Sequence, residues 1–210
     1  MAPDRHLHEH IYLSLKALLI SRHYRSGQRI DVTELADRFR SSVTPVRDGL
    51  CRLVGEEVVE MLPGGGFRLW LPTAGCIRDL YFWNGQHLLA ALHATPFIRV
   101  AALLETAWRH MNTAGNDPDM QVAGLFQALA DASANREFSR RVAAANARLA
   151  HIRRMECALV PGIAAEVRRL ASPGASDVQK AVRRRILAYH RRRILLVPQI
   201  ADRLALDASS

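Results

Sequence analysis

The chain has 210 residues, 49% hydrophobic and 23% charged, with a formal net charge of +9, so it has ample length for a buried core. Its longest apolar stretches, residues 13–20 and 194–198, fall well short of a membrane span, and its first ten residues carry charges where a signal peptide would turn apolar. Three scattered cysteines suit a reducing compartment, so we expect a cytoplasmic protein with no disulfide framework and no membrane partner.

The N-terminal third of the chain alternates helical and strand-like patterns. Residues 5–22 predict a helix, and the short helix TELADRF follows a capping-box-like spacing of Asp31 and Glu34. SSVTPVRDGL (residues 41–50) opens a third helix, since proline is tolerated in a first helical turn. VVEML and FRLWL, joined by PGGG, alternate as the strands of a β-hairpin do. We therefore expect a winged helix-turn-helix over residues 1–72.

The remainder, residues 73–210, shows no comparable strand pattern. We predict six helices, near residues 74–94, 96–114, 118–133, 135–158, 161–171 and 176–205. The fold class is therefore mainly α: a winged helix-turn-helix followed by an all-helical six-helix bundle. The charge is unevenly shared, because the first 72 residues hold ten basic and nine acidic side chains, and the rest hold nineteen and eleven. Charge alone points to the second part for nucleic acid.

The third predicted helix carries the pattern of a DNA-recognition helix. At 100° per residue, Val46, Leu50 and Leu53 fall on one side, and Thr44 and Arg47 fall on the other. Hydroxyl groups of Ser42 or Thr44 can cap the first turn, and a helix N-terminus with hydroxyls and an arginine suits phosphates and guanine edges. The alternative is an ordinary capped amphipathic helix with a solvated arginine.

This segment resembles the DNA-binding domain of the GntR family of bacterial transcription regulators. The resemblance covers about 65 residues, from Leu7 to Leu71, and is carried by Ser42, by TPVR at residues 44–47 and by the glycine-rich wing. It implies DNA contacts from a defined set of residues: Thr33, Arg38, Ser42, Thr44, Arg47, Gly65, Gly66 and Arg68.

The segment departs from the pattern of the family in four places. Val43 stands where arginine or another polar residue is usual, and Thr33 aligns with an arginine that some members use. Glu57 replaces the glycine that ends the helix, and the wing tip at residues 64–66 lacks a basic side chain. Each lost contact to a phosphate weakens binding to every sequence alike, whereas each lost base contact relaxes specificity.

The helical part resembles the FadR C-terminal (FCD) branch of that family, in its VanR-like form. The resemblance rests on the number of helices, on DLYFWNGQHLLAAL, on LFQALADASANREF and on a last helix that contains a histidine. Many members of the branch bind a divalent metal through one aspartate and three histidines, and the metal helps to hold a carboxylate effector.

Carried over position by position, the metal ligands are largely lost in this chain. Ala123 and Gln127 replace the aspartate and the first histidine, Arg168 or a neighbour replaces the second, and only His190 is retained. Alanine cannot ligate and arginine repels a cation, so we expect no metal and no other cofactor.

An arginine can take over the anchoring of an acid. We place Arg183 on the apolar face of the last helix, with His190, as a candidate for direct acid binding. Asn84, which replaces an arginine of the family, together with Gln127 and Arg168, completes the effector candidates. A hydrogen-bonded core histidine, a solvated arginine run and an apolar or filled pocket are the alternatives.

The sequence therefore favours a transcriptional repressor without enzymatic activity. It would bind a pseudo-palindromic operator in double-stranded DNA as a homodimer and respond to a small-molecule effector such as an organic acid. The alternative is an effector- or protein-binding module that keeps the fold but has weakened specific DNA recognition.

Overall fold

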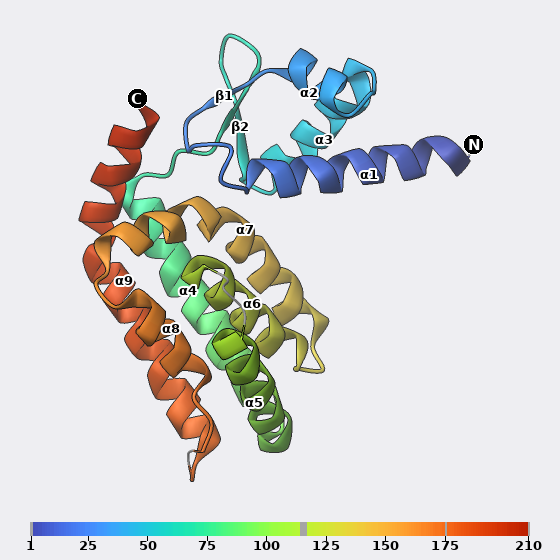
Figure 1. Cartoon of the computed structure of the whole chain (residues 1–210). Coiled ribbons are helices and arrows are strands. Elements are labelled where there is room, and N and C mark those ends of the chain that lie inside the picture. The colour runs from blue at the N-terminus through green and yellow to red at the C-terminus, as the bar shows by residue number, and fades with distance from the viewer. Residues whose placement is uncertain (1, 114–116, 175, 210) are drawn as a thin grey trace. The chain divides into compact units, whose positions relative to one another are not determined.

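The computed structural model describes residues 2–113, 117–174 and 176–209 (Figure 1). The chain divides into two compact units, Met1–Pro72 with Arg203–Ser210, and Thr73–Asp202. The expected fold class is confirmed, because helices dominate and the strands are confined to one small sheet. In the part of the chain that the structure describes, no helix has the length and hydropathy of a membrane span.

The first unit has the winged helix-turn-helix order expected from the sequence. Its elements are α1 (Ala2–Leu19), β1 (Arg29–Ile30), α2 (Val32–Arg38), α3 (Val43–Gly55), β2 (Val59–Met61) and β3 (Phe67–Leu69). β1 was not predicted, since two residues are too few to show alternation. It pairs antiparallel with β3, which lies between β1 and β2, so the predicted hairpin is part of a three-stranded sheet.

The predicted faces of α3 are confirmed. Val46, Leu50 and Leu53 are fully buried, and α3 packs closely against α1. Gly49 permits this approach, because a Cβ at that position would lie 2.7 Å from Leu15 Cδ1 of α1. The burial of this face fixes the opposite, polar face of α3 toward solvent.

Both helices of the helix-turn-helix end in a Schellman motif whose left-handed residue is not glycine. Glu57 has φ 57°, with hydrogen bonds from Glu57 N to Val54 O and from Val58 N to Leu53 O. Arg40 has φ 50° and occupies the same position after α2. The family glycine that Glu57 replaces thus stands at a position where the backbone favours glycine.

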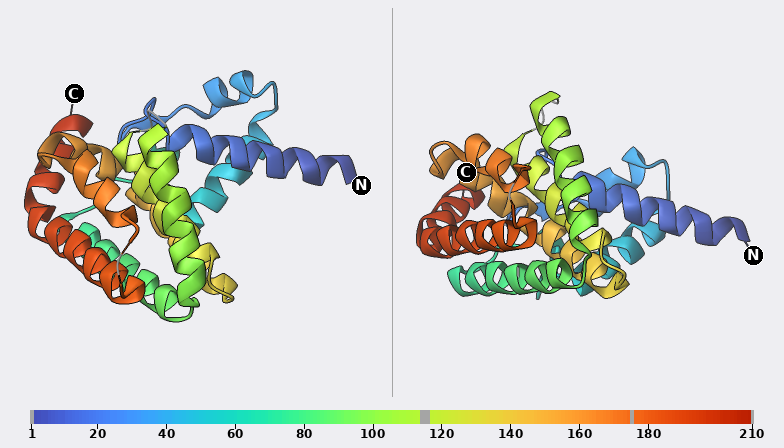
Figure 2. Two further views of the ribbon diagram at one scale, coloured as in Figure 1. Left: turned by 60° about the horizontal axis from the view of Figure 1, so that its bottom comes forward. Right: turned by 90° about the horizontal axis from the view of Figure 1, so that it is seen from below.

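The six helices predicted for residues 73–210 are present, and the last of them continues from the second unit into the first at Arg203. They are α4 (Ala74–His93), α5 (Phe97–Thr113), α6 (Pro118–Asp131), α7 (Arg136–Leu159), α8 (Ile163–Ala171) and α9 (Val178–Ala208). Thr73 and Asn135 cap α4 and α7 through their side chains. Figures 1 and 2 show α4 and α9 side by side and in opposite directions, which brings Asn84 to His190.

Candidate nucleic-acid interface and buried polar centre

The N-terminal part of α3 presents a polar surface with one free cation. Ser42, Thr44 and Arg47 are exposed. Two other charged side chains of α3 are tied to α1: Arg52 Nη1 lies 2.7 Å from Glu9 Oε2, and Asp48 Oδ2 lies 3.5 Å from His8 Nδ1. Among the described residues Arg47 has no ion-pair partner, and its guanidinium lies 5.9 Å from the ring of Phe67 in β3.

The first turn of α3 keeps its backbone amides open. Ser42 is the N-cap residue, but the expected capping bond from its side chain is not formed. By contrast, Asp31 caps α2 and accepts hydrogen bonds from Thr33 N and Glu34 N. The uncapped backbone amides at the start of this 13-residue helix are available to donate to an anion, and the positive end of the helix dipole lies at the same place.

The other predicted DNA contacts differ in their availability. Thr33, Arg38, Gly65 and Gly66 are exposed, and nothing lies within 4 Å of a Cβ built at either glycine. Arg68 lies opposite Glu60 in the sheet, and its Nε donates to Glu60 Oε2 at 2.5 Å. Arg68 is therefore half-buried and already neutralised, so it is a poorer phosphate ligand than its sequence position indicates.

In the helical unit the polar groups meet at a buried carboxylate, Glu156 of α7. Arg193 Nε donates to Glu156 Oε2 at 2.8 Å, and the hydroxyls of Tyr81 and Tyr189 also donate to this carboxylate. Arg193 Nη1 donates to Glu166 Oε1 at 2.6 Å. Burial raises the pKa of Glu156 to about 7, against the opposing effect of Arg193. This network joins α4, α7, α8 and α9 through side chains that are almost wholly buried.

His190 and Asn84 form a second buried pair beside this network. His190 Nδ1 lies 2.8 Å from the carbonyl oxygen of Ile186, which can only accept, so Nδ1 carries the proton. Asn84 Nδ2 then donates to His190 Nε2 at 3.1 Å. Burial lowers the pKa of His190 to about 4, and the nearby guanidiniums of Arg153 and Arg193 act in the same direction. His190 is therefore neutral, with both ring nitrogens engaged.

Arg153 of α7 is a second buried guanidinium, 1% exposed. Its Nη1 donates to Asn146 Oδ1 at 2.8 Å, and its Cζ lies 5.7 Å from the ring centroid of Phe126. Asn146 Nδ2 in turn donates to the carbonyl oxygen of Ala123 at 3.1 Å. The positive charge thus lies beside a position that the family resemblance assigned to a metal ligand.

The structure brings together only part of the effector set predicted from the sequence. Asn84 and His190 are in contact, and Gln127 is half-buried and bonded to Asp131 and Ser139. The placement of Arg183 on the buried face of α9 is wrong, since the side chain is exposed. Arg168 is also exposed, on α8.

The arginines that do enter the core, Arg153 and Arg193, were missed in the sequence. A signal for Arg193 exists, because it lies seven residues after Ile186 and seven before Ile200, on one stripe of α9. Because basic residues occur on all sides of this helix, the spacing alone does not single out Arg193 as the buried one.

The donor set does not fit the metal of the FCD branch. Ala123 has no ligating atom, Arg168 lies at the surface, and His190 uses its Nε2 lone pair for Asn84. The nearby guanidiniums of Arg153 and Arg193 also repel a cation. No group of three His, Cys, Asp or Glu side chains suited to a metal ion occurs among the described residues.

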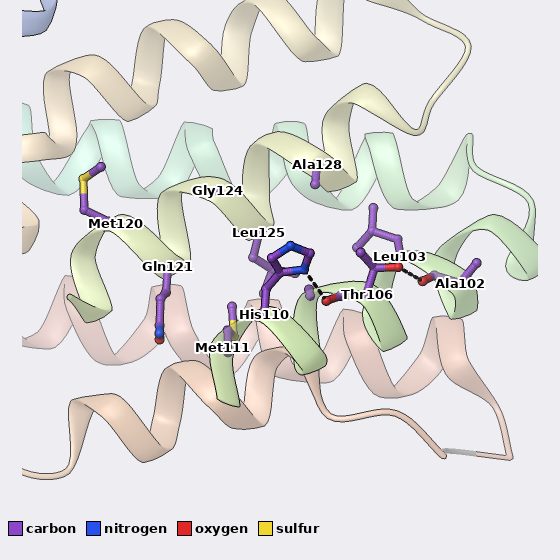
Figure 3. Close-up of a pocket in the computed structure, with 11 residues that line it drawn as sticks. Ala102, Leu103, Thr106, His110, Met111, Met120, Gln121, Gly124, Leu125 and Ala128 are labelled. Carbon is purple, nitrogen blue, oxygen red and sulfur yellow. Dashed lines mark hydrogen bonds between the residues drawn. The ribbon is translucent and has the colours of Figure 1, made fainter. Parts of the chain in front are cut away.

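A cavity of about 510 Å³ lies between α5 and α6 (Figure 3). Its walls are mostly apolar, with Leu103 and Met111 from α5 and Leu125 from α6. Thr106 Oγ1 donates to the carbonyl oxygen of Ala102, and His110 Nδ1 donates to that of Thr106. The size suits a small molecule, although no site residue predicted from the sequence lines this cavity.

Comparison with known proteins places the winged part in a family. Residues 7–69 match the model of the bacterial regulatory proteins of the gntR family. The Nta operon transcriptional regulator of Aminobacter aminovorans is 36% identical over 64 residues, which is 30% of each chain. Residues 7–69 are therefore similar to the winged domain of gntR-family regulators, and the match to this curated relative spans less than a third of its length.

Solved structures extend the likeness to the whole fold. A GntR transcriptional regulator from Rhodococcus sp. RHA1 has a TM-score of 0.75 at 16% identity, over 91% of this chain and 97% of its own. E. coli McbR/YncC has a TM-score of 0.64 at 17% identity, over 92% and 97%. At these identities the likeness concerns the fold alone.

Proposed function

We propose that the chain is a transcriptional regulator of the GntR family that binds double-stranded DNA through its N-terminal unit and acts as a repressor. The observation that carries this proposal is the exposed N-terminal surface of α3, where Arg47 has no ion-pair partner within the described part of the chain, while Asp48 and Arg52 pair with residues of α1. The match of residues 7–69 to a family of DNA-binding regulators supports it.

The proposed docking follows from this surface. The N-terminal end of α3 enters the major groove, where Arg47 donates to the edge of a guanine, and the open amides and Thr44 contact the adjacent phosphates. Gly65 and Gly66 allow the backbone of the wing to approach the DNA, because their left-handed φ values of 84° and 87° suit glycine. Arg38 adds a phosphate contact from the end of α2.

The remaining parts of the proposal concern assembly and control. The protein works in the cytoplasm as a homodimer on a pseudo-palindromic operator, dimerises through its helical unit and has no catalytic activity. A small organic acid in the helical unit, bound without a metal ion, shifts the population of DNA-competent dimers. The buried arginines beside Asn84 and His190 support an anionic effector.

A second candidate is an effector- or protein-binding module with weakened specific DNA recognition. It is favoured by the pairing of Arg68 with Glu60 and by a wing tip without a basic side chain, which remove two sources of phosphate contact. The near-neutral first 72 residues point in the same direction.

Selection of genomic fragments by the purified full-length protein separates these candidates, with Arg47→Ala as the test variant and Arg183→Ala as the control for loss of charge alone. The regulator proposal expects an inverted repeat that wild type and Arg183→Ala retain and that Arg47→Ala loses. Equal, salt-sensitive retention of all fragments by all three proteins supports the module instead.

A further inference from the structure

The guanidinium of Arg153 is a buried cation without a counter-ion. Its hydrogen bond from Nη1 goes to a neutral amide, that of Asn146, and among the described residues no carboxylate lies within the 4.0 Å of an ion pair. The pKa of Arg153 is lowered by burial, and the charge of Arg193 contributes to this effect. Tyr189 and the carboxylate of Asp119 oppose this effect, but Asp119 forms no ion pair with Arg153, which stays protonated.

The unpartnered donors of Arg153 lie on one edge of the guanidinium. Nε and Nη2 are both buried and have no hydrogen-bond partner in the structure. Their N–H bonds are parallel and match the spacing of the two oxygens of a carboxylate, which makes this edge the usual one for bidentate carboxylate binding. This edge of Arg153 is therefore suited to a planar anion that accepts two parallel hydrogen bonds.

Arg193 shows the contrasting arrangement of a structural buried arginine. It is equally buried, but its Nε and Nη1 donate to two carboxylates, Glu156 and Glu166. Glu156 and Glu166 are thus committed to Arg193, whose one unpartnered donor is Nη2. Arg153 is as deeply buried, but it has no carboxylate in ion-pair contact among the described residues and leaves two donors, Nε and Nη2, unpartnered.

We propose that the Nε–Nη2 edge of Arg153 binds the carboxylate of a small organic anion without a metal ion. This inference rests on the proposed function and deepens it, since it names the anchor and the chemical class of the effector. A cavity of about 350 Å³ lies between α4 and α7 and is lined by Asn84, which also donates to His190, although Arg153 itself does not line it. Since Arg153 is 1% exposed, the anion enters when the helices part, and its binding favours one packing of α7.

The test measures stabilisation of the full-length protein by formate, acetate, lactate, malonate and citrate, each against chloride and sulfate at equal ionic strength. Thermal unfolding is followed by Trp83 and Trp108 fluorescence in a Trp70→Phe background, which confines the signal to the helical unit. We expect at least one carboxylate to raise the Tm saturably, with unchanged affinity after dialysis against a chelator.

Substitutions of Arg153 distinguish a ligand anchor from a structural residue. Arg153→Met should leave the Tm of the anion-free protein unchanged or higher, because it removes an unpaired buried charge, and should abolish the response to the carboxylate. Arg153→Lys keeps the charge but not the two-donor edge, so affinity should fall about tenfold or more. Arg168→Met and Arg183→Met, at exposed arginines, should retain the full response.

Three results would overturn the proposal: no carboxylate raises the Tm, chloride or sulfate acts equally well, or Arg153→Met responds like wild type. A requirement for added Zn²⁺ would also contradict it. None of these outcomes affects the recovery of an inverted repeat by wild type and its loss in Arg47→Ala, so failure of this inference and failure of the DNA-binding proposal can be told apart.

Discussion

The two units keep their functional arginines in opposite environments. Arg47 is exposed at the start of a helix and has no ion-pair partner among the described residues, whereas Arg193 is fully buried between two carboxylates. Water solvates the guanidinium of Arg47, so this group can give up hydrogen bonds to water and donate to the edge of a base instead. Arg193 needs its carboxylates in place before the helices can close around it. The same residue type therefore takes the proposed role in DNA recognition in one unit and a structural role in the other.

The largest effect is expected from breaking the buried network. Arg193→Met removes the cation that pairs with both Glu156 and Glu166 and keeps most of the apolar stem of the side chain. The free energy of unfolding of the helical unit should fall by about 3–5 kcal/mol, because two buried carboxyl groups lose their partner. Urea unfolding followed by Trp83 and Trp108 fluorescence in the Trp70→Phe background measures this, with Arg153→Met as the buried control that should not destabilise. A loss below about 1 kcal/mol for Arg193→Met would mean that protonation or hydration of the two carboxyl groups replaces Arg193 at little cost.

Arg47→Ala is expected to act on binding and not on folding. The specific DNA affinity should fall by about 1–3 kcal/mol, and the Tm should stay within the error of wild type because the side chain is exposed. Arg38→Ala, at the proposed phosphate contact, should instead weaken binding to all sequences alike. It should also reduce the slope of log affinity against log salt concentration by about one. Fluorescence anisotropy at several salt concentrations separates the two behaviours. Equal effects of the two variants on specific and non-specific DNA would argue against their assigned roles.

The pH dependence of stability sharpens the contrast further. With its pKa raised to about 7, Glu156 contributes stability that is complete below pH 4.5 and is lost as the pH rises through 7. With its pKa lowered to about 4, His190 contributes stability that is complete above pH 6.5 and is lost as the pH falls through 4. Between these limits the two slopes oppose each other, so the helical unit should show little net pH dependence.

His190→Asn removes one of the two opposing contributions. Its stability should fall with rising pH by about 1 kcal/mol per unit between pH 5 and 6.5, whereas wild type stays nearly level. Urea unfolding of the helical unit at each pH, with the same tryptophan signal, provides the slope. If the stability of His190→Asn depends on pH as little as that of wild type, Glu156 is ionised throughout this range.

The smallest effect concerns the backbone after α3. Glu57→Gly relieves a left-handed conformation in a non-glycine residue and should stabilise the winged unit by about 1 kcal/mol. Asp37→Gly, inside α2, is the opposite control and should destabilise it by a similar amount. Trp70 fluorescence in a Trp83→Phe, Trp108→Phe background reports the change. If Glu57→Gly is less stable than wild type, the interactions of the Glu57 side chain stabilise the fold by more than its left-handed backbone conformation destabilises it.

The winged unit was predictable because its signals are local. The cap at Asp31, the proline in the first turn of α3 and the apolar spacing of Val46, Leu50 and Leu53 each act within a few residues, and each is found as expected. Strand β1 was not predicted, because its two residues are a strand only through their pairing with β3. The pairing of Arg68 with Glu60 also depends on strand register, which the hairpin sequence leaves open.

The helical unit was predictable in its elements but not in its polar centre. All six helices follow from apolar spacing and from breakers such as Pro161. Which arginine of α9 turns inward depends on where Glu156 and Glu166 lie, on two other helices. In the sequence of α9, only the spacing of Arg193 from Ile186 and Ile200 separates it from the exposed Arg183, and the partners that decide its burial lie outside α9.

The central claim, that the N-terminal end of α3 reads DNA through Arg47, is tested most directly by a double-mutant cycle. The affinities of wild type and Arg47→Ala are measured for the recovered half-site and for each single base-pair substitution in it. We expect one G·C pair whose replacement reduces the binding free energy of wild type by about 1–3 kcal/mol and that of Arg47→Ala by almost nothing. If every base-pair substitution costs the two proteins the same, Arg47 does not contact a base and the account is contradicted.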